Sequence, residues 1–185
     1  YKTYKVRPIK EEVRTQRDEK VADRKSRLIV RGSNAIENEL FKVQVEQNGS
    51  ITLLDKTTGA SYRGRNTFED VGDVGDEYNH DPPSQDKTYS SENLAAKITP
   101  CTSASARCTL KIEYDLVLPI GATNDRKTRS STLVSCPAAC YVSLYPGVPR
   151  VDFRLELLNN AKDHRLRILF PTGMGCKHSY ADQAF

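Results

Sequence analysis

The sequence predicts an all-β protein in which antiparallel sheets pack face to face as a sandwich. Three observations predict this class. Hydrophobic and polar residues alternate in several segments, with the two-residue period of a half-buried strand. Turns rich in Gly, Asn, Asp and Pro join these segments, and no segment shows a comparable helical period. Because each strand has one hydrophobic face, each sheet must bury that face against a second layer.

The first clear strands form a hairpin. Alternation from Phe41 to Val45 predicts one strand, and Ile51 to Leu53 resumes the pattern on a return strand. Asn48-Gly49 lies between them and tolerates the positive φ of a type I′ turn. We expect a second turn at 55–59 to end the return strand.

The longest alternation runs for eleven residues, from Cys108 to Leu118, and predicts a long strand. Two more strands are predicted at 151–157 and 166–170, with Pro171 ending the second. The polar link between them, 159–164, is short, so we expect these two strands to pair as an antiparallel hairpin.

Charge is concentrated near the beginning of the chain. Twelve of the eighteen residues from Lys10 to Arg27 are charged, but both signs are interspersed, which disfavours a nucleic-acid arm. The net charge of +4 is also too small to argue for a nucleic-acid or membrane partner. We expect a first strand at 1–8, a charged excursion or insertion at 9–34 that is partly helical or flexible, and the sandwich at 35–185.

The sequence predicts a reduced, cytoplasmic protein. No apolar run approaches the roughly 20 residues that a membrane helix needs, and no signal peptide begins the chain. The cysteines are odd in number and lack zinc-ribbon spacing; a disulfide between Cys136 and Cys140, or between Cys101 and Cys108, is sterically conceivable. Both ends are expected to be cuts, so the sandwich would be truncated.

One segment has a composition suited to binding. From Glu69 to Pro83 the chain combines acidic residues with a tyrosine, a histidine, glycines and prolines, and we expect a loop that presents polar groups. Carboxylates can bind sugar hydroxyls, and an aromatic ring can stack on the C–H face of a sugar. An acidic surface loop, with Ca²⁺ affinity through Asp73, Asp76 and Asp81, is an equally good interpretation.

Other catalytic patterns are absent from the sequence. His80, His164 and His178 lie far apart without metal-ligand spacing, so each is interpreted as a surface or hydrogen-bonding residue. No nucleophile elbow, phosphate-binding loop or dinucleotide-binding glycine pattern occurs.

Several motifs, in order, resemble glycoside hydrolase family 38. The bacterial branch of that family is similar in the segment FEDVGDVGDEYNHDPP, although His80-Asp81 stands where the branch usually has Tyr-Ser. The other matching segments are IENELFKV, NGSITL, DKTTG, NAKDHRLR, FPT and YADQ, between Ile36 and Gln183. Tyr1–Tyr4 resembles the strand that follows the helical region of the family.

The resemblance implies a β-sandwich of the galactose mutarotase-like super-sandwich type from a retaining α-mannosidase, either a mannosylglycerate hydrolase or a related enzyme. It implies that the nucleophile, the acid/base and the zinc ligands lie upstream, in catalytic and helical domains of the parent chain. This chain would then hold no catalytic residue and no metal, and would supply scaffold and one wall of the active site. Tyr78 is the expected substrate contact, with Asp76 and Asn79 as weaker candidates.

Two alternatives stay open at this stage. The acidic loop with Tyr78 would also suit an autonomous carbohydrate-binding module. A structural domain that joins subunits, including a homo-oligomer, would use the apolar area that an excised domain exposes.

Overall fold

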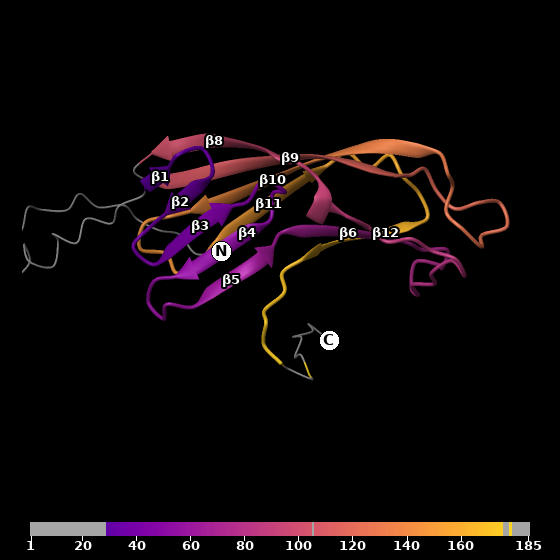
Figure 1. The fold of residues 1–185 in the computed structure, drawn as a ribbon, viewed down its shortest axis with the longest axis horizontal. Coiled ribbons are helices and arrows are strands. Elements are labelled where there is room, and N and C mark those ends of the chain that lie inside the picture. Colours follow the sequence, from indigo (N-terminus) through magenta and orange to yellow (C-terminus); the bar gives the residue numbers. More distant parts are fainter. Residues whose placement is uncertain (1–28, 105, 176–177, 179–185) are drawn as a thin grey trace, which may run out of the picture.

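The computed structural model describes residues 29–104, 106–175 and 178, and over them the chain is all-β, as predicted (Figure 1). The strands form three antiparallel sheets, and a single 3-10 turn, η1 (Ser91–Asn93), occurs within the described part. The predicted first strand at 1–8 and most of the charged segment at 9–34 lie outside the described residues. None of the described helices has the length and apolar character to cross a membrane.

The N-terminal strands form a five-stranded sheet in sequence order, β1-β2-β3-β4-β5. Its hairpins place hydrophobic residues of β3 and β4 on one face, as the alternation predicted. The strands are β1 (Ile29–Arg31), β2 (Ala35–Glu37), β3 (Phe41–Val45), β4 (Ile51–Asp55) and β5 (Ser61–Arg65).

Two further sheets complete the fold, one with the order β11-β10-β9-β8 and one with the order β12-β6-β7. The four-stranded sheet contains the long predicted strand, which becomes β9. The strands of the first are β8 (Lys97–Ala104), β9 (Arg107–Pro119), β10 (Leu133–Leu144) and β11 (Asp152–Leu157), and those of the second are β6 (Thr67–Gly72), β7 (Tyr89–Ser90) and β12 (His164–Leu169).

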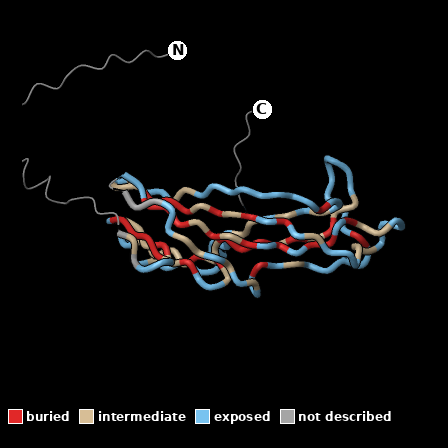
Figure 2. The backbone as a smooth tube through the Cα atoms, turned by 90° about the horizontal axis from the view of Figure 1, so that it is seen from above, coloured by how far each residue is buried: buried red, intermediate tan, exposed pale blue. Residues whose placement is uncertain are grey.

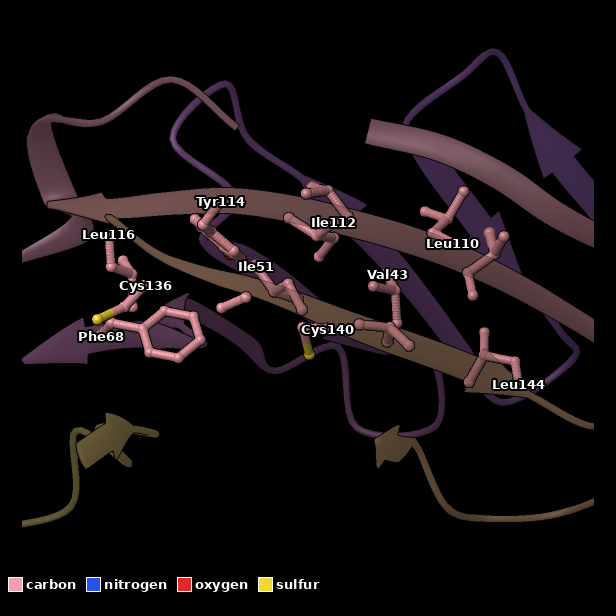
Figure 3. Close-up of a cluster of buried hydrophobic side chains, with 14 of the residues drawn as sticks. Val43, Ile51, Phe68, Leu110, Ile112, Tyr114, Leu116, Cys136, Cys140 and Leu144 are labelled. Atoms are coloured by element: carbon pink, nitrogen blue, oxygen red, sulfur yellow. The ribbon is translucent and has the colours of Figure 1, made fainter. Parts of the chain in front are cut away.

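The core lies where the hydrophobic faces of β3 and β4 meet those of β9 and β10 (Figure 3). Leu110, Ile112 and Val142 on one side and Val43 on the other are completely buried. The buried residues form a band along the inside of the elongated molecule (Figure 2). Because each such side chain contributes about 1.5–3 kcal/mol on burial, this band is the main source of stability.

The β3–β4 turn is not of the predicted type. A type I′ turn needs positive φ at both central residues, but Gly49 has a φ of 77° and Asn48 is not among the described residues with positive φ. The Gly49 amide donates to the Glu46 carbonyl (2.9 Å), and the Glu46 amide donates to the Ser50 carbonyl (2.8 Å). A tight turn therefore ends in a glycine bulge. A Cβ on Gly49 would lie 2.3 Å from the Tyr114 hydroxyl, so the glycine permits this close approach.

The predicted hairpin at the end of the chain is wrong. β11 pairs with β10 in one sheet, whereas β12 pairs with β6 in another. The short polar link therefore carries the chain between two sheets instead of turning it back within one. Alternation reveals that a segment is a strand, but it does not identify the partner.

The strand β10 was not predicted, although it lies at the centre of its sheet. Pro137 lies within it, and a proline argues against a central strand because it cannot donate to the ladder. A disulfide between Cys136 and Cys140 is also excluded, because four residue steps along an extended strand separate their Cα atoms by about 13 Å. Both thiols are buried, and burial raises the pKa of Cys140 to about 12.

Candidate functional site

The loop from Gly72 to Pro83, called here the 72–83 loop, leaves the end of β6 and returns to the same place. The Gly72 amide donates to an Asp86 carboxylate oxygen at 2.8 Å. A Cβ on Gly72 would lie 2.7 Å from Cδ of Pro83, so only glycine lets the two ends of the loop approach this closely. The loop therefore has a narrow, well-packed base.

Asp73 holds the two sides of the loop together. Its Oδ1 accepts from the amides of Gly75 (3.0 Å) and Asp81 (3.1 Å), and the Val74 amide donates to the Asp81 carbonyl (2.7 Å). The hydrogen bond from the Asp81 amide is the main reason that the pKa of Asp73 is lowered. This carboxylate is thus a structural part of the loop.

Asp76 plays the same part at the tip. Its Oδ1 accepts from the amides of Tyr78 (2.9 Å) and Asn79 (2.8 Å), and these bonds, led by that of Tyr78, lower the pKa of Asp76. A Cβ on Gly75 would lie 2.0 Å from the Asn79 carbonyl oxygen, which keeps the turn tight. At least one oxygen of Asp76 is therefore engaged within the loop.

The three predicted substrate contacts lie together at the tip, and all three are exposed. Tyr78 is 84% exposed, the largest exposure among the exposed large hydrophobic residues of the described chain. Its backbone is fixed by Asp76 while its ring is open to solvent. The arrangement can present an aromatic ring and a phenol hydroxyl to a polar ligand, but it shows no ligand contact by itself, so the three assignments stay predictions.

Residues distant in sequence support the loop from outside, and sequence reasoning did not find them. The Arg126 guanidinium donates to the Val74 carbonyl at 2.5 Å. The Asp73 amide donates to the Asp163 carbonyl at 2.9 Å, and the Asp163 carboxylate accepts from the Ala122 amide at 3.1 Å. Arg126 and Asp163 both have positive φ, 57° and 48°, which is uncommon for residues other than glycine.

A buried ionic cluster lies directly under the loop. Asp70 places Oδ1 2.5 Å from Nη2 of Arg129 and Oδ2 2.5 Å from Nδ1 of His164, and the three side chains are 2%, 4% and 6% exposed. The interpretation that placed Glu69 and Asp70 in the acidic loop is therefore wrong. Both belong to β6, where Asp70 lies on the same inward face as Phe68. Removal of one member would leave a buried charge without compensation.

Further contacts hold the Arg129 and His164 side chains in the cluster. The Arg129 guanidinium lies 5.2 Å from the Tyr89 ring centre, and Nε2 of His164 is 3.1 Å from Oδ1 of Asn159. Nε and Nη1 of Arg129 are buried without a hydrogen-bond partner among the described residues. His164 is thus a hydrogen-bonding residue, as interpreted from the sequence. Nothing in the sequence pattern linked it to Arg129.

No group of three or more His, Cys, Asp or Glu side chains in the described part of the chain could hold a metal ion. His80 and His178 are exposed, and His164 is engaged with Asp70. The described residues therefore do not fit a zinc site.

A second surface of interest is the apolar side of β11, called here the β11 face. Phe153, Leu155 and Leu157 are each 37–40% exposed although they alternate with charged residues along the strand. The Phe153 ring packs edge-on against Phe170, with 4.9 Å between ring centres, and Leu158 adds to the exposed apolar area. β11 is also an edge strand, with one side of its backbone not paired within the described sheets.

Comparisons with known proteins agree with this fold. The family described as "Glycosyl hydrolases family 38 C-terminal domain" matches residues 36–185. A protein named "Putative mannosylglycerate hydrolase" from Halalkalibacterium halodurans is 34% identical over 82% of this chain and 18% of its own length.

Two solved structures from Enterococcus faecalis are also similar. One, titled an alpha-mannosidase, has a TM-score of 0.78 and 32% identity over 82% of this chain and 19% of its own. The other, titled a protein in the Glycosyl Hydrolase Family 38, has a TM-score of 0.77 and 33% identity over 80% and 20%. The chain thus spans about a fifth of the length of these relatives. It belongs to glycosyl hydrolase family 38, as the C-terminal domain of that family.

Proposed function

We propose that this chain forms one wall of the active site in a longer α-mannosidase, with Tyr78 in contact with the sugar. The observation that carries this proposal is the contrast at the loop tip: the Tyr78 backbone is fixed by Asp76, yet its side chain is 84% exposed. Ordering an exposed loop costs conformational entropy, so an ordered loop that presents an aromatic ring is well suited to a ligand.

The phenol hydroxyl of Tyr78 would hydrogen-bond a sugar hydroxyl, and its ring would pack against a C–H face. The side-chain amide of Asn79 would add a second polar contact beside it, and the second carboxylate oxygen of Asp76, Oδ2, would be a third. The name of the relative supports a mannosylglycerate as the finer substrate assignment. An α-mannoside is the coarser substrate class that we propose.

The catalytic groups would come from the rest of a longer chain. The family resemblance implies an aspartate nucleophile, an acid/base carboxylate and a zinc ion upstream of this domain, in a cytoplasmic enzyme. We propose that the same upstream domains cover the β11 face, because the relatives are about five times longer than the matched region and Phe153, Leu155 and Leu157 stay 37–40% exposed among the described residues. This occupant would bury Leu155 and Leu157 while leaving the 72–83 loop open to substrate.

The test uses a full-length family 38 hydrolase that carries this domain. Tyr78→Phe removes only the hydroxyl, and we expect kcat/KM for an aryl α-mannoside to fall about tenfold, the equivalent of one hydrogen bond of about 1.4 kcal/mol. The matched control is Tyr62→Phe, at a partly exposed tyrosine on β5, which should leave kcat/KM unchanged. Equal kcat/KM in Tyr78→Phe and the unmodified enzyme would overturn the assignment of Tyr78.

A further inference from the structure

We propose that Arg129 is a positioning residue, which holds the base of the 72–83 loop and thereby the orientation of Tyr78. The part of this inference that concerns catalysis rests on the proposed contact between Tyr78 and substrate. The part that concerns loop order rests on the structure of this chain alone. Arg129 lies between β9 and β10, 46 residues after Pro83, where the loop ends (129 − 83).

Arg129 reaches the loop base in two ways. Its Nη2 lies 2.5 Å from Oδ1 of Asp70, which is two residues before Gly72 on β6. Its Cδ would also be 3.2 Å from a Cβ on Gly72, so the aliphatic part of the side chain packs where the loop leaves the strand. The Arg129 side chain thus contacts the base of the loop through both its charge and its apolar stem.

The cluster fixes Asp70 as well as pairing with it. Each Asp70 oxygen has its own partner, Arg129 on one side and His164 on the other, so the carboxylate cannot rotate without losing one of them. The residue before His164 accepts from the Asp73 amide, so the same cluster also anchors the segment that supports the loop from outside. The cluster therefore lies next to both sides of the loop base, where the β6–β12 ladder pairs Gly72 with His164.

The remaining nitrogens of Arg129 argue that the guanidinium is more than a stabilising contact. Nε and Nη1 are buried and lack a hydrogen-bond partner among the described residues, an arrangement that is costly for stability. A buried ion pair can often be replaced by apolar residues of similar volume without loss of stability. The geometry that this arginine imposes on Asp70 and Gly72 accounts for a buried guanidinium at this position.

The first test measures hydrogen exchange in the full 185-residue chain. Arg129→Met keeps most of the side-chain volume, and we expect the increase in exchange rate at the Gly75, Tyr78 and Asp81 amides to be at least about tenfold larger than any increase at the amides of core strand β9. The control, Arg154→Met, breaks an exposed ion pair on β11 and should leave loop exchange unchanged. Unchanged loop exchange in Arg129→Met would overturn the proposal.

A second variant covers the case in which Arg129→Met does not fold. Asp70→Asn combined with Arg129→Met removes both charges, so neither is left buried alone. The folded double variant should show the same fast exchange confined to the loop. Slow, unmodified loop exchange in it would contradict a positioning role for Arg129.

The catalytic part is tested by a double-mutant cycle in the full-length hydrolase. Arg129→Met should lower kcat/KM about as much as Tyr78→Phe, and should add little in the Tyr78→Phe background, because it acts through the same side chain. Full additivity would overturn positioning through Tyr78. If Tyr78→Phe alone has no effect while loop exchange still increases in Arg129→Met, the proposed function fails and the control of the loop by Arg129 stands.

Discussion

The 72–83 loop and the β11 face are both exposed, but for opposite reasons. The loop is irregular and polar, and Asp73 and Asp76 accept hydrogen bonds from four of its backbone amides, so the loop is ordered although it is exposed. β11 is a regular strand, yet Phe153, Leu155 and Leu157 are left partly in solvent. An ordered polar loop needs no cover, whereas an apolar strand face gains stability from one. The first is therefore suited to a ligand and the second to another domain.

The contacts that hold the two regions in place also differ. The loop is anchored by Asp70, whose carboxylate is buried against Arg129 and His164. β11 is held by its ladder with β10, and its ion pair between Arg154 and Glu156 is exposed and lies within the strand. Buried ion pairs are costly to break one partner at a time, and exposed ones contribute little. Mutations in the two regions should consequently differ in their effects on stability.

The largest expected effect is at the loop anchor. Asp70→Ala should lower the free energy of unfolding of the chain by about 3–5 kcal/mol, because it leaves Arg129 buried without its charge partner. Glu156→Ala, the matched change in an exposed pair, should cost less than about 1 kcal/mol. Urea unfolding measures both. Equal losses would contradict the contrast between a buried anchor and an exposed strand.

The next effect concerns leucines on two strands of the same sheet. Leu110→Ala on β9 should cost about 2–5 kcal/mol, since Leu110 is completely buried. Leu155→Ala on β11 should change the stability of the isolated chain by less than about 1 kcal/mol, because that side chain is already 40% exposed. Thermal or urea unfolding distinguishes them. A cost for Leu155→Ala as large as that for Leu110→Ala would show that the β11 face is already covered.

The smallest effect is the response of the loop to pH. The pKa values of Asp73 and Asp76 are lowered by the amide hydrogen bonds that their carboxylates accept. The bonds therefore contribute fully above the ordinary value of 3.8 and are lost as the pH falls through the lowered pKa values. In an NMR titration the Tyr78 amide shift should follow this change with a midpoint below 3.8, and Asp76→Asn should abolish it. A midpoint above 3.8 would contradict the role of these carboxylates.

The sequence predicted the strands better than their pairing. Alternation found β3, β4, β9, β11 and the core of β12, because each carries several large hydrophobic residues on one face. It missed β10, where small and sulfur-containing residues face inward and Pro137 interrupts the pattern. Nor did it predict a strand at β1, β2, β5, β6, β7 or β8. It also mispaired β11 with β12, since pairing depends on the other strands of both sheets.

For the site, the sequence located the residues at the loop tip but not the buried residues that support the loop. Tyr78, Asp76 and Asn79 are close together in the chain, so one composition signal found all three. The support comes from Asp70, Arg129 and His164, which meet only in the folded chain. An aspartate at an inward strand position looks like a loop residue until its buried partners are known, which is why Asp70 was assigned to the loop.

The most direct test of the account is hydrogen exchange in three samples: the 185-residue chain, the full-length hydrolase, and that hydrolase with an uncleavable α-mannoside. We predict that β11 amides are protected in the full-length enzyme relative to the isolated chain and do not change further with ligand. The 72–83 loop, whose amides already donate to Asp73 and Asp76, should gain further protection only when the mannoside is added. Loop exchange that is unaffected by the mannoside, or ligand protection at β11 instead, would contradict the account.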